Sequence, residues 1–318
     1  MSAISELSTI HRVKAKTPEE KRIQAKEAGR DNKAGYLFLL PWLTGLIVIT
    51  IGPMIASLYL SFTNYSLIQA PKWIGLDNYV RMLGDERLHN SLKVTFIYVF
   101  VSTPLQLIVA LGIALLLNEG MKGLPIYRSV FYLPSMLGGS VAIAVLWRQM
   151  FEVDGLVNQV LRATGIGATT SWIGDPSTAL WTIILLHVWT FGSPMVIFLA
   201  GLRQIPGMYY EAASVDGASK WSQFKKITLP LLSPIIFFNL VLQIIGAFQA
   251  FTQAYVVSNG TGGPSDSTMF YTLYLYQRGF VQFQMGYASA MAWLLLIVIA
   301  AFTAINFWFS KRWVFYGD

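Results

Sequence analysis

Six long apolar runs, free of Asp, Glu, Lys and Arg, constrain this sequence more than any other feature. A helix needs about 20 mostly apolar residues to cross the hydrocarbon core of a membrane. The six runs cover residues 36–61, 94–117, 129–147, 180–202, 231–257 and 285–309. Only 12% of the 318 residues are charged, against roughly 25% in soluble domains. The sequence therefore predicts an all-α, polytopic membrane protein with six transmembrane helices.

The distribution of Lys and Arg predicts how the chain is oriented. Six spans place both termini on one side, and that side carries 16 of the 23 basic residues, eight of them within residues 12–33. Basic loops stay in the cytoplasm, so we expect both termini to lie there, in a plasma membrane (the inner membrane of a Gram-negative cell). The predicted parts are a basic cytoplasmic segment 1–34, a transmembrane domain 35–310 with a cytoplasmic loop 203–230, and a cytoplasmic tail 311–318.

Two regions outside the spans leave alternatives open. Thr17, Pro18 and Glu20 form a helix-start pattern, which favours a short amphipathic helix over residues 18–28; a disordered basic arm is the other interpretation. The loops 62–93, 148–179 and 258–284 are expected on the opposite side from the termini. Their Trp, Pro, Gly and Asn content suits a docking surface, or plain connectors.

The loop between the fourth and fifth runs has an unusual construction for a connector. Pro206 closes one element, residues 209–216 are good helix formers, Gly217 ends that helix and Pro230 opens the next span. Residues 212–214 are small, so the backbone of another protein can come close to the helix there. We therefore expect a short helix across the cytoplasmic face.

The same loop carries a spaced motif. Glu211-Ala212-Ala213 is followed after three residues by Gly217, and after nine more by Ile227-Thr228-Leu229-Pro230. This pattern resembles the signature of binding-protein-dependent ABC importer permeases. Further stretches are similar to the carbohydrate-uptake branch, and in particular to the larger membrane subunit of the maltose transporter: Leu39-Leu40-Pro41, residues 73–79, residues 131–134 and residues 259–264. The chain lacks that subunit's two extra N-terminal helices and large periplasmic insert, and it has two additional residues before Gly263-Pro264.

The resemblance implies a type I ABC importer permease fold and a function. The chain would move a sugar or oligosaccharide, delivered by an extracytoplasmic solute-binding protein, by alternating access. Its expected partners are a second permease subunit of a different sequence and two cytoplasmic ATPase subunits. The resemblance implies that the short cytoplasmic helix couples the chain to the ATPase through Tyr210, Glu211, Ala212, Ala213, Asp216 and Gly217.

Several chemical functions have no support in the sequence. It has no glycine-rich phosphate loop ending in Gly-Lys-Ser/Thr, so we expect ATP and Mg to bind the separate ATPase and this chain to hold no cofactor and perform no catalysis. It has no cysteine and no His, Asp and Glu at metal-ligand spacing, so no metal site is expected. Basic and aromatic residues are not interleaved as in nucleic-acid-binding proteins.

Polar residues inside the spans are candidates for the solute path, because each is costly in lipid unless it faces a partner or a cavity. Amides, hydroxyls and aromatic faces suit a neutral sugar. The expected path residues are Ser140, His187, Trp189, Thr190, Gly192, Gln243, Gly246 and Gln249. The sugar-contacting positions of the maltose permease, carried over by the resemblance, fall near His187, Thr190, Gly192 and Met195, and at Gln243, Gly246 and Ala247. A packing role remains open for each glutamine and for His187.

Three other functions remain open at this point. A secondary transporter or channel would usually place ionisable residues inside its spans, where this sequence has only His187. An ABC permease for a glycerol phosphodiester, an acidic oligosaccharide or a peptide would share the spaced motif. A structural membrane protein would not need the motif.

Overall fold

The computed structural model describes residue 19 and residues 36–120, 123–167 and 169–315. These residues are helical or in loops; apart from two isolated β-bridges they contain no strand. The chain has two units, divided after Ser57. The proposed amphipathic helix over residues 18–28 lies outside the described residues except for Glu19, as does most of the predicted segment 1–34.

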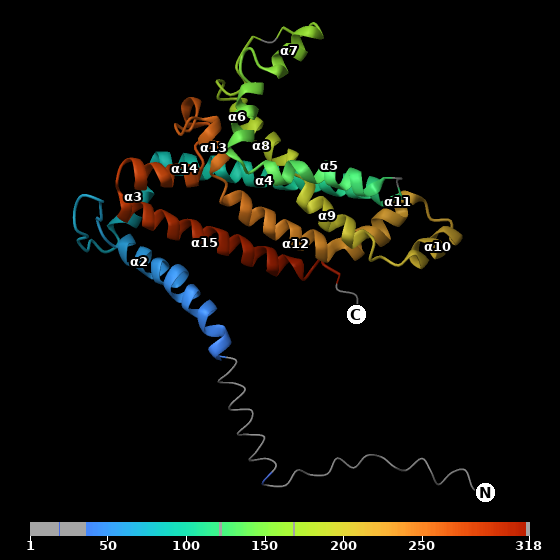
Figure 1. The fold of residues 1–318 in the computed structure, drawn as a ribbon, viewed down its shortest axis with the longest axis horizontal. Helices are drawn as coiled ribbons and strands as arrows, with labels where there is room; N and C mark the ends of the chain where they lie inside the picture. The colour runs from blue at the N-terminus through green and yellow to red at the C-terminus, as the bar shows by residue number, and fades with distance from the viewer. Residues whose placement is uncertain (1–18, 20–35, 121–122, 168, 316–318) are drawn as a thin grey trace. The chain divides into compact units, whose positions relative to one another are not determined.

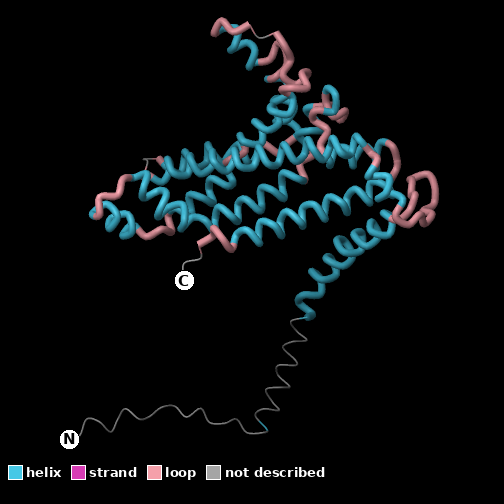
Figure 2. The backbone as a smooth tube through the Cα atoms, turned by 180° about the vertical axis from the view of Figure 1, so that it is seen from behind, coloured by secondary structure: helices cyan, strands magenta, loops and turns pink. Residues whose placement is uncertain are grey.

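The helices follow one another along the chain, and the longer connections are residues 62–76 and 164–178 (Figures 1 and 2). Residues 36–61 are one helix, which includes a π-helical stretch Leu46–Ile51 and α2 (Gly52–Ser61). The remaining α-helices are α3 (Asp77–Leu83), α4 (Glu86–Asn118), α5 (Leu124–Leu137), α6 (Val141–Met150), α7 (Leu156–Ala163), α8 (Ala179–Trp189), α9 (Gly192–Leu202), α10 (Gly207–Val215), α11 (Lys220–Gln223), α12 (Leu229–Phe248), α13 (Thr252–Val257), α14 (Tyr271–Tyr276) and α15 (Met285–Ser310). Single turns of other helix types are Phe224–Thr228, Pro264–Asp266 and Gln277–Val281.

Six candidate membrane spans are present among the described residues when each bent pair of helices counts as one. Four are single helices, Tyr36–Ser61, Glu86–Asn118, Lys220–Phe248 and Met285–Ser310. The third span is the pair α5 and α6, which bends by 95°, and the fourth is the pair α8 and α9, which bends by 40°. The predicted third span, residues 129–147, is thus broken at residues 138–140, where Gly138 and Gly139 follow α5 and Ser140 caps α6 with its hydroxyl.

The fifth span also differs from its prediction. Pro230 does not open it: the helix begins at Lys220, and a π-helical turn, Phe224–Thr228, precedes the proline. The wider turn accommodates a residue that has no amide hydrogen and whose ring would crowd the preceding turn. At its other end the helix stops at Phe248 instead of continuing to Val257, and α13 starts after a three-residue break.

Within residues 58–315, α4 packs against α8, α9 and α12 (Figure 1). Two hydrophobic clusters form along it, one that includes Tyr98 and Phe270 and one that includes Ala110 and Phe198. The fully buried small residues of α4 allow α9 to lie close, as in other membrane helix pairs. On α4 the two clusters are separated by a buried polar layer, which consists of Ser102, Thr103 and Gln106.

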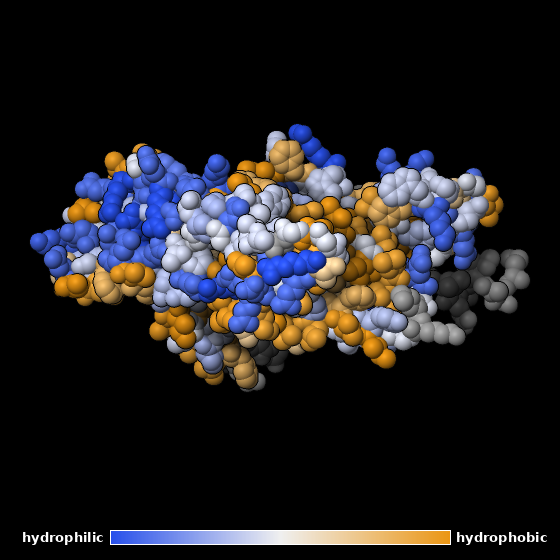
Figure 3. Space-filling view, turned by 90° about the horizontal axis from the view of Figure 1, so that it is seen from above, coloured by the Kyte–Doolittle hydropathy of each residue, from blue (hydrophilic) through white to orange (hydrophobic). Residues whose placement is uncertain are grey.

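Two of the loops predicted to lie opposite the termini, 62–93 and 258–284, meet at one end of residues 58–315, here named the α14 end. The Asp85 carboxylate caps α4 by accepting a hydrogen bond from the Leu88 amide. It also accepts hydrogen bonds from Tyr274 (2.7 Å) and Tyr287 (2.8 Å). Arg278 forms an ion pair with it at 2.9 Å. A second ion pair, at 2.8 Å, joins Arg87 to Asp266. In the face shown in Figure 3, hydrophilic residues cover this end, as expected for loops in water.

Acidification is expected to loosen the α14 end through Asp85. Burial acts to raise the pKa of this carboxyl, but the hydrogen bonds from Tyr274 and Tyr287, the Leu88 amide and the charge of Arg278 together bring the pKa below its ordinary 3.8. The carboxylate therefore stabilises the fold above about pH 4, and this contribution is lost as the pH falls through the lowered pKa. The melting temperature in detergent is measured from pH 6 to pH 3. We expect it to fall further in the wild type than in Asp85→Asn. Equal losses would contradict the role assigned to Asp85.

Candidate coupling helix and solute path

The short helix predicted between spans four and five is present as α10. Pro206 precedes its first turn, and Gly217 follows it in the left-handed conformation, with φ +73°. The amide of Ala218 donates to the Ala213 carbonyl at 2.9 Å, and the amide of Gly217 donates to the Ser214 carbonyl at 3.1 Å. These two bonds satisfy carbonyls that the helix end leaves free, in the arrangement known as a Schellman motif.

α10 is fastened to the fifth span on one side and exposed on the other. The hydroxyl groups of Tyr210 and Thr228 are hydrogen-bonded at 2.9 Å, which joins α10 to the turn before α12. Met208, Val215 and Trp221 are 67%, 89% and 71% exposed. Exposed apolar side chains of this size at one place mark a contact surface for a protein or a membrane.

A groove of about 560 Å³ runs between α10 and the start of α12. From α10 it is lined by Tyr209, Ala212, Ala213 and Asp216, and from the fifth span and the C-terminal segment by Lys226, Ile227, Pro230, Leu231 and Phe315. The amide of Phe315 donates to the Ser233 hydroxyl at 2.8 Å, which fixes the C-terminal segment beside the groove. Of the predicted coupling residues, Glu211 and Gly217 lie exposed outside this lining.

Three helix breaks come together elsewhere in residues 58–315. They are residues 138–140 between α5 and α6, residues 190–191 between α8 and α9, and residues 249–251 between α12 and α13. Gln253 donates to the Gly138 carbonyl at 3.2 Å, and Ser135 donates to the Thr190 carbonyl at 2.9 Å. Thr190 also packs closely on Gly138: a Cβ added to Gly138 would lie 2.1 Å from the methyl group of Thr190. The polar backbone of three spans is thus gathered at one place.

The predicted path residues of spans three to five fall into two groups. Ser140 and Thr190 lie at the breaks, and the ring of Trp189 lies 5.9 Å from that of Trp147. Gln243, Gly246 and Gln249 share one face of α12 up to its break; Gln249 is exposed, and a Cβ on Gly246 would meet nothing within 4 Å. This first group therefore lies at a break or on the face of α12 that leads to one.

His187 and Gly192 form the second group and lie behind the breaks. The His187 ring packs edge-on against Tyr98 at 5.4 Å, and its Nε2 atom is buried without a partner among the described residues. A Cβ on Gly192 would lie 2.5 Å from the Phe131 carbonyl oxygen and 2.7 Å from the Tyr132 α-carbon. Gly192 therefore allows α5 and α9 to touch, and both residues have packing contacts here.

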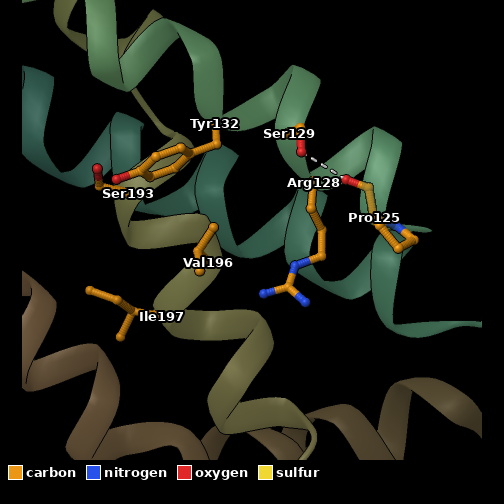
Figure 4. Close-up of a pocket in the computed structure, with 7 residues that line it drawn as sticks. All are labelled: Pro125, Arg128, Ser129, Tyr132, Ser193, Val196 and Ile197. Carbon is orange, nitrogen blue, oxygen red and sulfur yellow. Dashed lines mark hydrogen bonds between the residues drawn. The ribbon is translucent and has the colours of Figure 1, made fainter. Parts of the chain in front are cut away.

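A further groove, of about 530 Å³, lies between α5 and α9 (Figure 4). Tyr132 points towards Ser193 across it, and Arg128 extends along it. None of its lining residues was among the predicted path residues. The spacing of Arg128 and Tyr132 by one helical turn in the third span was a signal that could have indicated a shared face.

Among the described residues no group of three or more His, Cys, Asp or Glu side chains is placed to hold a metal ion. The breaks instead offer carbonyls, hydroxyls and amides. Such groups form hydrogen bonds to an uncharged polar solute.

Comparison with known proteins gives consistent matches. Residues 86–314 match the family model described as "Binding-protein-dependent transport system inner membrane component". The chain is 55% identical to the "Probable ABC transporter permease protein YesP" of Bacillus subtilis (strain 168), over 92% of this chain and 95% of YesP. It is 32% identical to the "Lactose transport system permease protein LacF" of Rhizobium radiobacter, over 87% of this chain and 94% of LacF. It is 33% identical to the "Trehalose/maltose transport system permease protein MalF" of Thermococcus litoralis, over 90% and 96%.

Solved structures share the fold. A chain from the crystal structure of a bacterial ABC transporter "involved in the import of the acidic polysaccharide alginate" superposes with a TM-score of 0.75 at 22% identity, covering 91% of this chain and 99% of that one. A chain from the same kind of transporter "in complex with alginate pentasaccharide-bound periplasmic protein" gives 0.77 at 22% identity, covering 90% and 96%.

Proposed function

The chain belongs to the binding-protein-dependent transport system inner membrane components, and we propose that it carries a sugar or oligosaccharide through the membrane as the permease subunit of an ABC importer. Membership makes it a multi-pass membrane permease with the ABC importer fold. The solute is the proposed part. It is supported by the lactose and trehalose/maltose permeases, which align with this chain over nearly their whole length.

The observation that carries the proposal is the meeting of three broken spans. Broken helices expose backbone groups that would be costly in lipid, and they persist where they line a cavity or are satisfied by protein. Here the breaks adjoin the open face of Gln243, Gly246 and Gln249. The amides of Gln243 and Gln249 and the hydroxyls of Ser140 and Thr190 at the breaks match the hydroxyls of a neutral sugar. The ring of Trp189, at the end of α8, matches the ring faces of such a solute.

We propose that α10 is the coupling helix. Its exposed surface would dock in a cleft of an ATPase subunit, with Tyr210 anchoring it to span five and Glu211, Ala212, Ala213, Asp216 and Gly217 forming the contact. ATP and Mg would bind two such ATPase subunits. Their closure would pull α10 and tilt the spans attached to it, which shifts the permease between two states.

The remaining partners are a second permease subunit of different sequence and an extracytoplasmic solute-binding protein. The Lys and Arg bias supports a cytoplasmic position for α10 and for both termini. The α14 end then faces outward, where its ordered loops offer a surface to the loaded binding protein. One of the superposed transporters is in complex with an "alginate pentasaccharide-bound periplasmic protein", which supports this arrangement.

An anionic solute is the second candidate. Arg128 lines the groove between α5 and α9, and a cation in this position favours a phosphate or a carboxylate. The sn-glycerol-3-phosphate transport system permease protein UgpA of Agrobacterium fabrum is 32% identical over 89% of this chain.

Reconstitution tests both candidates. The chain, its second permease and its ATPase are placed in proteoliposomes with the binding protein and ATP. We expect a neutral oligosaccharide to accumulate and to stimulate ATP hydrolysis. Uptake of glycerol 3-phosphate in place of every sugar would favour the second candidate, and uptake that persists without the ATPase would contradict both.

Gln243→Ala is expected to reduce sugar uptake about tenfold, because one hydrogen bond to a solute hydroxyl contributes about 1 kcal/mol and its loss strands polar groups. The measurement is initial uptake in the same vesicles at several sugar concentrations. Leu242→Ala is the matched control, since Leu242 is the neighbouring residue and 47% exposed. An unchanged solute profile in Gln243→Ala would assign Gln243 to helix packing.

A further inference from the structure

Gln106, in the middle of α4, contacts the backbone of the broken fourth span. Its side chain is buried, with 1% of its surface exposed. Its Nε2 atom lies 3.1 Å from the His187 carbonyl oxygen and 3.0 Å from the Thr190 carbonyl oxygen. The same atom lies 3.0 Å from the Thr190 hydroxyl. One amide group of span two thus reaches a carbonyl in the last turn of α8 and a carbonyl in the break between α8 and α9.

The Thr190 carbonyl needs a donor from outside the helix because of Pro194, whereas the His187 carbonyl also accepts the amide and the hydroxyl of Thr190. A proline has no amide hydrogen, so the Thr190 carbonyl, four residues earlier, receives no helical bond from it. An unpaired buried carbonyl costs about 1–3 kcal/mol. Gln106 from α4 and Ser135 from α5 replace the missing donor, and the Ser135 hydroxyl also accepts the amide of Ser193 at 2.9 Å. The bend is held by side chains from two other spans.

The position of Gln106 along α4 adds to this argument. It belongs to the polar layer between the two hydrophobic clusters, so the bend in span four lies where the packing of the bundle is interrupted. Gln106 Oε1, Ser102 Oγ and Thr103 Oγ1 are buried there without a partner among the described residues. Burying polar atoms without partners costs free energy, and apolar side chains would fill this layer without that cost. The presence of a glutamine here therefore indicates that its amide donor is needed.

We propose that Gln106 is a positioning residue for solute transport: it fixes the break of span four, and with it Trp189 and Thr190, in the geometry that receives the solute. This inference rests on the proposed function only for the identity of the solute. Gln106 itself lies behind the break and does not touch the solute.

The test compares Gln106→Met, which keeps the shape and removes the donor, with Ser102→Ala. Ser102 lies one turn away on α4 and is equally buried, and its hydroxyl has no partner among the described residues. Hydrogen–deuterium exchange of residues 187–195 is measured in the assembled transporter. We expect exchange about tenfold faster in Gln106→Met, as the loss of about 1.4 kcal/mol of hydrogen bonding implies, and unchanged exchange in Ser102→Ala. Should Gln106→Met fail to assemble, Ser135→Ala, which removes the second donor, takes its place.

Uptake of the sugar forms the second arm. We expect Gln106→Met to raise the half-saturating concentration of loaded binding protein or to change the ranking of sugars, with the basal ATPase rate unchanged. Exchange or uptake equal to that of Ser102→Ala would overturn the inference. A wild-type transporter that imports no sugar would instead contradict the proposed function. In that case hydrogen–deuterium exchange, together with uptake of whichever solute the transporter does carry, would still decide the role of Gln106.

Discussion

Replacement of Gly217 by valine is expected to reduce ATP-driven uptake at least tenfold while the chain still inserts and assembles. Gly217 has φ +73° and ends α10 through two backbone hydrogen bonds. A Cβ there would meet nothing within 4 Å, so the cost of valine is conformational, about 1–3 kcal/mol for a branched residue in this region. We expect the end of α10 to change conformation to relieve this strain. The change would displace the surface that we assign to the ATPase.

The measurements are uptake and ATP hydrolysis in the same vesicles. Hydrolysis that no longer responds to the loaded binding protein, together with normal amounts of assembled complex, is the expected uncoupled state. Gly207→Ala is the control, because this glycine lies in the same helix and an added Cβ would come no closer than 4.0 Å to the Glu211 carboxylate. Normal transport by Gly217→Val would show that the end of α10 does not transmit force.

Gly192→Val is expected to abolish accumulation of the folded chain. A Cβ on Gly192 would lie 2.5 Å from the Phe131 carbonyl oxygen and 2.7 Å from the Tyr132 α-carbon. These are backbone atoms of α5 and cannot rotate away, so α5 and α9 must separate at a cost of about 3 kcal/mol or more. The break of span four, which Ser135 joins to α5, would separate with them.

Gly246→Val supplies the contrast to Gly192→Val. Gly246 faces open space on α12, so we expect normal amounts of folded protein but reduced uptake, because the added side chain projects into the proposed path. Amounts are measured by size-exclusion chromatography in detergent. Normal amounts of Gly192→Val would contradict the close approach of α5 and α9, and full uptake by Gly246→Val would place the path elsewhere.

The sequence predicted well those features that depend on local composition. The apolar runs gave the number of spans, and Pro206 and Gly217 gave the position of α10 to within two residues. Such signals need no knowledge of distant contacts, because a span depends on hydropathy and a helix end depends on the backbone preferences of a few residues.

The breaks were less predictable, because partners far away in the chain stabilise them. No proline or glycine stands within residues 249–251, and the Ala250 carbonyl is taken by the Thr272 hydroxyl of α14. The break at residues 190–191 has a local signal in Pro194, but the donor that replaces the missing amide belongs to Gln106, which is 84 residues before Thr190. A buried glutamine in an apolar run was the visible signal, but its partner could not be read from the sequence.

The central claim is that α10 contacts an ATPase on the inner face of the membrane. Because the chain contains no cysteine, Val215→Cys provides a single attachment point for a photoactivatable cross-linker, at a side chain that is 89% exposed. Ile68→Cys, in the loop after span one and 83% exposed, is the control. Both variants are tested in the whole transporter, in right-side-out and inside-out vesicles. We expect Val215→Cys to form an adduct with the ATPase and to react with an added impermeant thiol reagent only in inside-out vesicles. We expect Ile68→Cys to form no such adduct and to react with the reagent only in right-side-out vesicles. Modification of Val215→Cys from outside, or the absence of an ATPase adduct both with and without ATP, would contradict the central claim.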